Sequence, residues 1–168
     1  MITRPRWLAP TSLILSIVGL RVSAYLTYEH YTGNETLVCT VTGVIDCGKV
    51  TSSAWSTFMG VPVALLGLLF FVALTILVLP SVWRRTEPWL DWLRFGLLTI
   101  GLGMALYLVW AELFRIEAIC LWCTVVHVVT LLLFFVVVLD AALRPIDDPD
   151  QTSDLPPRRA GSVADKGR

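Results

Sequence analysis

The chain has 168 residues, of which 56% are hydrophobic, and its mean hydropathy is +0.74. A soluble domain of this length could not bury so much apolar surface in one core, so the composition indicates a protein surrounded by membrane lipid. The formal net charge is zero, which leaves no basic footprint for nucleic acid.

Four apolar segments follow one another along the chain. They are Leu8–Tyr28, Val61–Val82, Trp89–Leu113 and Ala118–Leu143. Each is long enough for a helix to cross a hydrocarbon core about 30 Å thick. The segments are continuously apolar, not alternating, and backbone polar groups in lipid must be bonded within the segment, which favours helices over a small barrel. Residues 1–143 are therefore predicted to form an all-α, integral membrane four-helix bundle.

The basic residues give the orientation of this bundle. Ten of the thirteen precede the first segment, lie in or beside the turn between the second and third, or follow the fourth. They are Arg4, Arg6, Arg84, Arg85, Arg94, Arg144, Arg158, Arg159, Lys166 and Arg168. Because cytoplasmic loops carry the excess of Lys and Arg, both termini are expected in the cytoplasm. The loop Glu29–Gly60 and the turn Phe114–Glu117 then face outward.

The first segment has an alternative interpretation as a cleaved signal peptide, with Val22-Ser23-Ala24 as the cleavage site. The apolar run is long for such a peptide and Arg21 is poorly placed before the site, so a membrane helix is favoured. Within a helix, Arg21 would either reach the interface or meet an acid such as Glu112.

Two segments lie outside the predicted spans. Val50–Phe58 is polar on one side and carries Trp55 and Phe58 on the other, which predicts a short surface helix in the first outer loop. Residues 144–168 are rich in Pro, Asp and Arg, and such a composition predicts a disordered cytoplasmic tail.

All four cysteines fall on the outer side of this topology, the oxidising side of a bacterial membrane. Cys39 and Cys47 lie in the outer loop with seven residues between them, and Cys120 and Cys123 form a C-x-x-C at the outer end of the fourth segment. Four cysteines allow three pairings, which the sequence leaves open. A C-x-x-C at a helix start is typical of thiol–disulfide chemistry, because the helix N-terminus favours the thiolate.

Two other uses of these cysteines stay open as alternatives. Static disulfides could brace a non-catalytic membrane subunit, although the small ring closed by a C-x-x-C is strained and opens readily. Four thiolates could also bind zinc, but the two spacings match zinc ribbons and fingers poorly, so no metal site is expected.

His127 follows the C-x-x-C on the same helical face, since Cys120, Cys123 and His127 stand at i, i+3 and i+7. It lies roughly 6 Å deeper than Cys123 along the helix axis. An ionisable residue within a membrane helix is a candidate functional group, the alternative being a histidine bonded to a neighbouring helix. A quinone dissolved in the membrane is the two-electron acceptor that fits this location, and His127 could donate a hydrogen bond to it.

Several short motifs together resemble the bacterial members of the vitamin K epoxide reductase family. In chain order they are Ser23-x-Tyr25-Leu26-Thr27-Tyr28, Cys39-x7-Cys47, Ser52-Ser53, Gly60-Val61-Pro62 and Cys120-x2-Cys123. The resemblance runs from about Ser23 to His127. It implies an enzyme of the bacterial inner membrane that re-oxidises a secreted thioredoxin-like (DsbA-type) partner and reduces menaquinone or ubiquinone. Disulfide formation in exported proteins would depend on that partner.

The resemblance also implies a role for each matching residue. Cys120 and Cys123 match the active-site pair, with Cys123 reducing the quinone. Cys39 would exchange with the partner, and Cys47 would pass the electrons to Cys120 through a transient Cys47–Cys120 disulfide. Ser53 matches a serine that holds the loop helix over the active site. In addition, His127 falls where a tyrosine contacts the quinone in vertebrate members.

The chain departs from the family in two respects. Many bacterial members carry a fused thioredoxin-like domain, whereas this chain ends at Arg168 without one, so the partner is expected to be a separate protein. Vertebrate members bind the quinone through an asparagine on the second helix. Because Val61–Val82 contains none, reduction of the epoxide is not implied.

Two related enzyme classes fit less well. In DsbB-type quinone reductases the C-x-x-C precedes the second cysteine pair, which is the reverse of the order here. A conduit that carries reducing electrons outward needs a thiol on the cytoplasmic side, and the predicted topology places none there.

Overall fold

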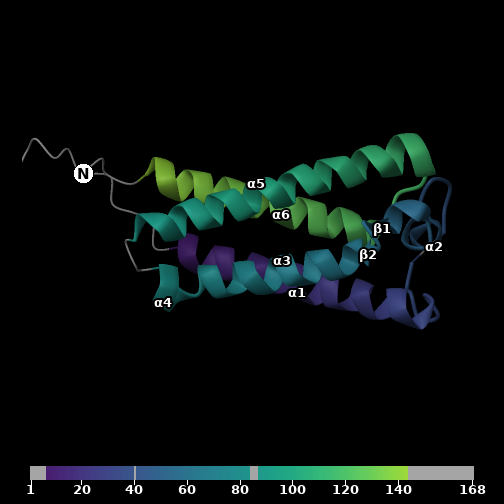
Figure 1. The fold of residues 1–168 in the computed structure, drawn as a ribbon, viewed down its shortest axis with the longest axis horizontal. Helices are drawn as coiled ribbons and strands as arrows, with labels where there is room; N and C mark the ends of the chain where they lie inside the picture. Colours follow the sequence, from purple (N-terminus) through teal and green to yellow (C-terminus); the bar gives the residue numbers. More distant parts are fainter. Residues whose placement is uncertain (1–6, 40, 84–86, 144–168) are drawn as a thin grey trace, which may run out of the picture.

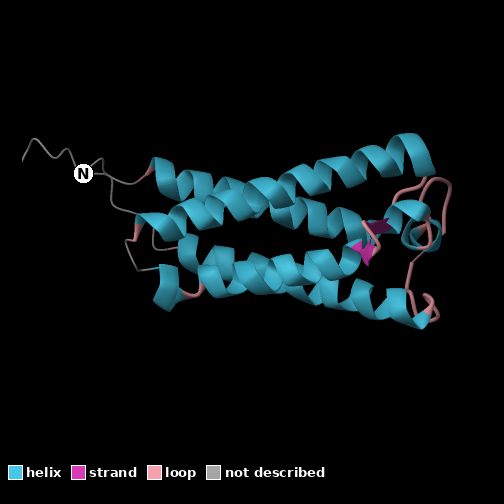
Figure 2. Cartoon of the chain, in the orientation of Figure 1, coloured by secondary structure: helices cyan, strands magenta, loops and turns pink. Residues whose placement is uncertain are grey.

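The computed structural model describes residues 7–39, 41–83 and 87–143. Four long helices lie side by side along the molecule (Figure 1): α1 (Leu8–Thr32), α3 (Val63–Val78), α5 (Pro88–Ala111) and α6 (Leu121–Ala142). The helix α1 packs against α3 and α6, and α5 packs against α6 and α3. The prediction of a mostly helical chain is confirmed (Figure 2). The predicted tail, 144–168, lies outside the described residues.

Within the described residues, three helical stretches are long and apolar enough to cross a membrane, namely α1, the stretch Pro88–Ile116 and α6. The remaining long helix, α3, has 16 residues and is about 24 Å long. It is shorter than the predicted segment Val61–Val82, because Pro80 cannot continue a helix and forces Leu79 into an extended conformation (ψ 139°). The chain then forms a separate turn, α4 (Pro80–Trp83).

Small residues on one face of α1 allow a close contact with α3. Ser12, Ser16, Gly19 and Ser23 are all buried, and they recur every three or four residues. A Cβ atom on Gly19 would lie 2.1 Å from the ring of Phe71 in α3, so the ring occupies the space that a side chain would need. Such small-residue seams let the backbones of membrane helices approach each other.

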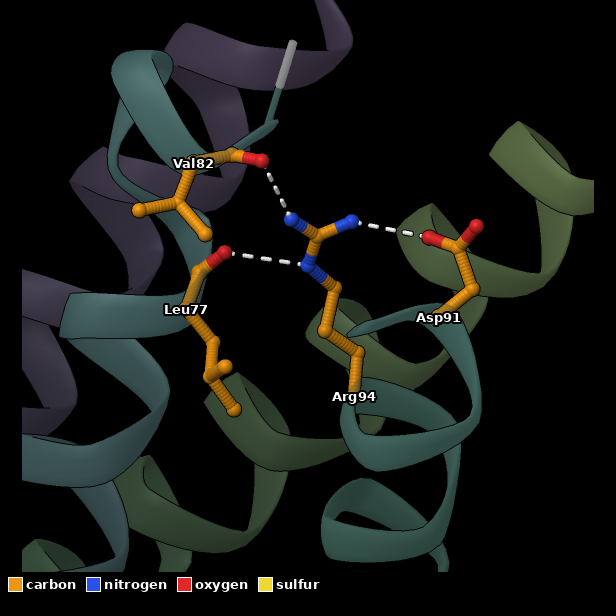
Figure 3. Close-up of polar contacts among 4 residues, drawn as sticks. All are labelled: Leu77, Val82, Asp91 and Arg94. Carbon is orange, nitrogen blue, oxygen red and sulfur yellow. Dashed lines mark hydrogen bonds and ion pairs between the residues drawn. The ribbon is translucent and has the colours of Figure 1, made fainter. Parts of the chain in front are cut away.

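Arg94 joins the ends of α3 and α4 to the start of α5 (Figure 3). Its side chain is 1% exposed. Nε donates to the carbonyl oxygen of Leu77 and Nη2 to that of Val82, both at 3.0 Å, while Nη1 pairs with Asp91 Oδ1 at 2.8 Å. The last carbonyl groups of a helix have no hydrogen-bond donor within that helix. Arg94 therefore supplies donors to carbonyl groups at the ends of α3 and α4.

The opposite end of the bundle carries the loop between α1 and α3 (Figure 1). It contains α2 (Cys47–Thr51), the 3₁₀ turn η1 (Ala54–Ser56) and an antiparallel hairpin of β1 (Thr57–Phe58) with β2 (Val61–Pro62). A short helix is present in this loop, but it begins earlier than the predicted Val50–Phe58 and ends at Thr51. Asp46 caps it, because its Oδ1 accepts the N–H of Lys49 at 2.9 Å.

The 3₁₀ turn η1 and the first strand of a hairpin replace the second half of that predicted helix. The turn residues of the hairpin, Met59 and Gly60, both have positive φ angles (53° and 83°). Two consecutive residues of this kind form the tight turn that joins antiparallel strands, and a helix cannot contain them. The chain therefore reverses at this point and enters α3.

Candidate active site

Cys39 and Cys47, in the loop between α1 and α3, form a disulfide, with their Cα atoms 6.0 Å apart. Cys120 and Cys123 are free thiols. The pairing that the sequence left open is thus Cys39 with Cys47. Cys39 is partly exposed, whereas Cys47 is fully buried.

Backbone pairing holds the loop beside the start of α6. Ile45 and Ile119 form a parallel bridge, and the N–H of Asp46 donates to the carbonyl oxygen of Ile119 at 3.2 Å. Cys47 and Cys120 each follow this bridge closely in the sequence. Both are fully buried, and they belong to one apolar cluster. The bridge therefore brings the loop disulfide and the C-x-x-C pair together.

Cys120 lies one residue before the apolar helix α6 and serves as its N-cap. Its Sγ accepts the backbone N–H of Cys123 at 3.4 Å. The hydrogen bond from the Cys123 thiol is the main cause that lowers the pKa of Cys120, and this backbone N–H adds to it. Burial and the nearby Glu112 act in the opposite direction. Cys120 therefore forms a thiolate at lower pH than an ordinary cysteine does.

A cavity of about 560 Å³ lies beneath the C-x-x-C pair. Three of the candidate residues, Cys123, His127 and Ser53, line it, together with apolar side chains from the four long helices. Cavities of this size and character commonly hold small organic molecules. The Nδ1 atom of His127 is buried and has no hydrogen-bond partner among the described residues.

The short elements of the loop between α1 and α3 line one end of this cavity. Trp55 and Phe58 line it, and their rings contact Tyr107 of α5 at centroid distances of 6.0 and 6.4 Å. The guanidinium of Arg115 lies 5.5 Å from the Trp55 ring. Ser53 holds the turn after α2, because its hydroxyl donates to the carbonyl oxygen of Val50 at 2.8 Å.

Sequence reasoning did not assign Glu112 to the site. The structure places its side chain, 5% exposed, on the wall of the same cavity as Cys123 and His127. Its carboxyl accepts the backbone N–H of Cys120. Glu112 begins a π-helical turn, η2 (Glu112–Ile116), a distortion that often occurs at functional sites. The signal in the sequence that could have identified Glu112 is an acidic residue near the end of an apolar segment. The sequence suggested Arg21 as the partner of Glu112, but Arg21 is exposed.

In this chain, long apolar helices hold a disulfide against a free C-x-x-C pair. This combination is typical of membrane proteins with thiol–disulfide chemistry. Residues 10–138 match the model of the Vitamin K epoxide reductase family. This match covers most of the chain, which therefore belongs to that family. The resemblance found in the sequence is confirmed, and the family is one of oxidoreductases.

Proposed function

We propose that this membrane oxidoreductase re-oxidises a separate extracytoplasmic thioredoxin-fold protein and passes the electrons to a membrane quinone, either menaquinone or ubiquinone. Disulfide formation in exported proteins would follow from the oxidised partner. One observation carries the proposal: the loop disulfide packs against a free C-x-x-C pair whose Cys123 lines an apolar cavity.

The same proposal includes the arrangement in the membrane. All four long helices cross the plasma membrane of a bacterial cell, with both termini in the cytoplasm and the cysteines at the outer face. The helix α3 alone is short for a complete crossing. The hairpin before it and α4 after it extend the apolar stretch to the two interfaces.

Exposure favours Cys39 as the sulfur that the partner attacks first. A partner thiolate attacks Cys39 Sγ, the Cys39–Cys47 bond breaks, and Cys47 leaves as a thiolate. The partner's second thiolate then attacks its own first sulfur, so the partner departs with a disulfide and Cys39 is freed as a thiolate. The reverse assignment is disfavoured because Cys47 is fully buried.

Two further exchanges move the electron pair to the inner cysteines. When Cys120 and Cys123 are joined, the Cys47 thiolate attacks Cys120 Sγ and expels Cys123 as a thiolate. Cys39 then attacks Cys47 Sγ, restores the loop disulfide and expels Cys120. The outcome, a Cys39–Cys47 disulfide above two free thiols, is also the distribution in the structure.

The cavity has the properties needed to hold a quinone. Its apolar walls suit the ring and the chain, and the unpaired Nδ1 of His127 can make a hydrogen bond to one ring oxygen when it carries a proton. A bound quinone accepts two electrons and two protons. Cys123 delivers the electron pair from the wall of the cavity, while Ser53 helps to keep the loop over it.

The test uses the full chain in lipid–detergent micelles, a reduced thioredoxin-fold oxidase and either quinone. Quinone absorbance and the free thiols of the partner are followed together. The wild type should reduce one quinone for each partner oxidised, and Cys123→Ser should lose this turnover completely. By contrast, Cys39→Ser should lose oxidation of the protein partner but still reduce quinone with dithiothreitol, a small dithiol that can react at the partly exposed Cys123. Full turnover by Cys123→Ser would contradict the proposal.

The alternative, a non-catalytic subunit with structural disulfides, predicts a different result in a trapping experiment. Static disulfides would resist mild reductant and form no mixed disulfide with a partner. On the proposed relay, the free Cys39 thiolate of Cys47→Ala should attack the disulfide of an oxidised partner, release the partner's second cysteine as a thiolate and hold the partner as a mixed disulfide. A complex trapped on Cys120 would overturn the order of the relay.

A further inference from the structure

Two aromatic side chains hold the backbone of Val38, the residue directly before Cys39. The Nε1–H of Trp122 donates to the carbonyl oxygen of Val38 at 2.9 Å. The N–H of Val38 donates to the hydroxyl oxygen of Tyr25, also at 2.9 Å, and this hydroxyl donates to the carbonyl oxygen of Thr36 at 3.2 Å. The two rings contact each other edge to face, with centroids 5.2 Å apart.

These two residues, called here the Tyr25–Trp122 clamp, come from different parts of the bundle. Tyr25 belongs to α1, whereas Trp122 lies between Cys120 and Cys123 at the start of α6. The side chain of Val38 is 76% exposed, so burial of that side chain does not hold the segment in place. The clamp therefore links the segment before Cys39 directly to the helix turn that carries the inner cysteines.

The clamp matters least while the Cys39–Cys47 disulfide is closed. The disulfide already confines the chain between Cys39 and Cys47. A short closed loop has little conformational entropy left, so additional contacts restrict the position of Cys39 only a little further. Once the bond opens, the segment before Cys39 keeps only its noncovalent contacts. The clamp then becomes a main restraint on where the Cys39 sulfur lies.

We propose that Tyr25 and Trp122 are positioning residues that keep Cys39 within reach of Cys47 while Cys47 is bonded to Cys120. This inference rests on the proposed function. In the step concerned, the Cys39 thiolate attacks Cys47 Sγ, the Cys39–Cys47 bond forms, the Cys47–Cys120 bond breaks, and Cys120 leaves as a thiolate with the electron pair. Holding the attacking group beside its target raises its effective concentration and so the rate of this exchange.

Two substitutions remove the hydrogen bonds and keep an aromatic side chain at each position. Trp122→Phe removes the donor to Val38, and Tyr25→Phe removes the hydroxyl. Reactions with reduced partner and quinone are quenched in acid, alkylated and mapped by mass spectrometry. The steady-state fraction of the Cys47–Cys120 disulfide should rise about fivefold in Trp122→Phe, as loss of one hydrogen bond implies, and at least as much in Tyr25→Phe, which loses two. Turnover driven by dithiothreitol through the inner pair should be unchanged.

Matched controls are available in the same chain. Tyr28→Phe alters an exposed tyrosine one turn further along α1, and Trp92→Phe alters an exposed tryptophan near the start of α5. Both should keep the wild-type fraction of the Cys47–Cys120 disulfide. Tyr25 and Trp122 hold the same residue, so their effects should not be independent. The rise in the Cys47–Cys120 disulfide in the double variant should therefore be smaller than the product of the rises in the two single variants.

A variant in the loop covers the case in which an aromatic variant fails to fold. Val38→Pro removes the N–H that Tyr25 accepts and leaves both helices intact, so it should also accumulate the Cys47–Cys120 disulfide. If all three variants retain the wild-type fraction and normal turnover, the clamp is overturned and the proposed function stands. If the wild type itself shows no partner-dependent quinone reduction, the proposed function fails instead.

Discussion

Cys120 and Cys123 are three residues apart, yet their surroundings differ. Cys120 precedes α6 and receives hydrogen bonds from the thiol and the backbone N–H of Cys123. Cys123 lies within the first turn of the helix and lines the cavity. The position at the helix start therefore makes Cys120 the better leaving group in an exchange, and the position further along makes Cys123 the thiol next to the candidate quinone site.

This difference predicts a pH dependence. In Cys39→Ala/Cys47→Ala, the reduced inner pair should lose its first proton below the ordinary cysteine value of about 8.5, because Cys123 lowers the pKa of Cys120. The measurement is thiolate absorbance near 240 nm against a variant with all four cysteines replaced by alanine. Adding Cys123→Ala should move the transition to higher pH. An unchanged midpoint would show that Cys123 does not stabilise this thiolate.

Residue-level predictions from the sequence succeeded where the helical period alone decides the geometry. Cys123 and His127 line one cavity because they are four residues apart on one helix. Their roles, and that of Ser53, stay predictions. The clamp could not be predicted, because the two aromatic side chains bind backbone groups of the loop residues Thr36 and Val38. No sequence pattern specifies where such loop backbone groups lie.

At the scale of the elements, a close contact joins α1 and α3. Gly19 admits the ring of Phe71, which is fully buried. Ser16 and Thr75 add a hydrogen bond of 2.7 Å between the same helices. This pair of helices forms two walls of the cavity, so its spacing also determines the width of the candidate site.

Gly19→Ala should therefore destabilise the protein. Forcing a methyl group against a packed ring costs about 1–3 kcal/mol, and thermal unfolding in detergent should shift down by several degrees. Phe71→Leu in the same chain should recover part of the loss, because it opens space at that point. As the control, Gly103→Ala should be tolerated, since a Cβ there meets no atom within 4 Å. Equal effects at Gly19 and Gly103 would contradict the explanation.

The sequence predicted the existence of the long helices better than their ends. Apolar composition reveals an element buried in lipid or protein, but it cannot distinguish a helix from a short hairpin at the interface. Thus Val61 and Pro62 belong to β2, and α3 ends at Val78 before Pro80. The sequence indicates the apolar side of Val50–Phe58. It does not indicate the turn after Phe58, because methionine is not a residue type that favours the positive φ angle of Met59.

For the whole molecule, the basic residues make a prediction about orientation. Lys49 and Arg115 are the basic residues at the end with the cysteines, and Arg94 lies at the other end in the described chain. In a background with all four cysteines replaced by serine, Met59→Cys and Trp92→Cys place exposed thiols at the two ends. A membrane-impermeant maleimide on intact spheroplasts should label the first and spare the second until the membrane is permeabilised. The reverse pattern would overturn the orientation.

The coexistence of an oxidised loop pair and a reduced inner pair has a consequence for the proposed relay. Each cysteine pair stores two electrons when its disulfide is reduced to two thiols. The loop pair is oxidised and can accept two electrons, whereas the inner pair is already reduced. Under the proposed function, encounters with a partner that diffuses in three dimensions outside the cell would not need to coincide with encounters with a quinone that diffuses in the plane of the bilayer. The protein would act as a small electron reservoir that continues to serve its partner through brief shortages of acceptor.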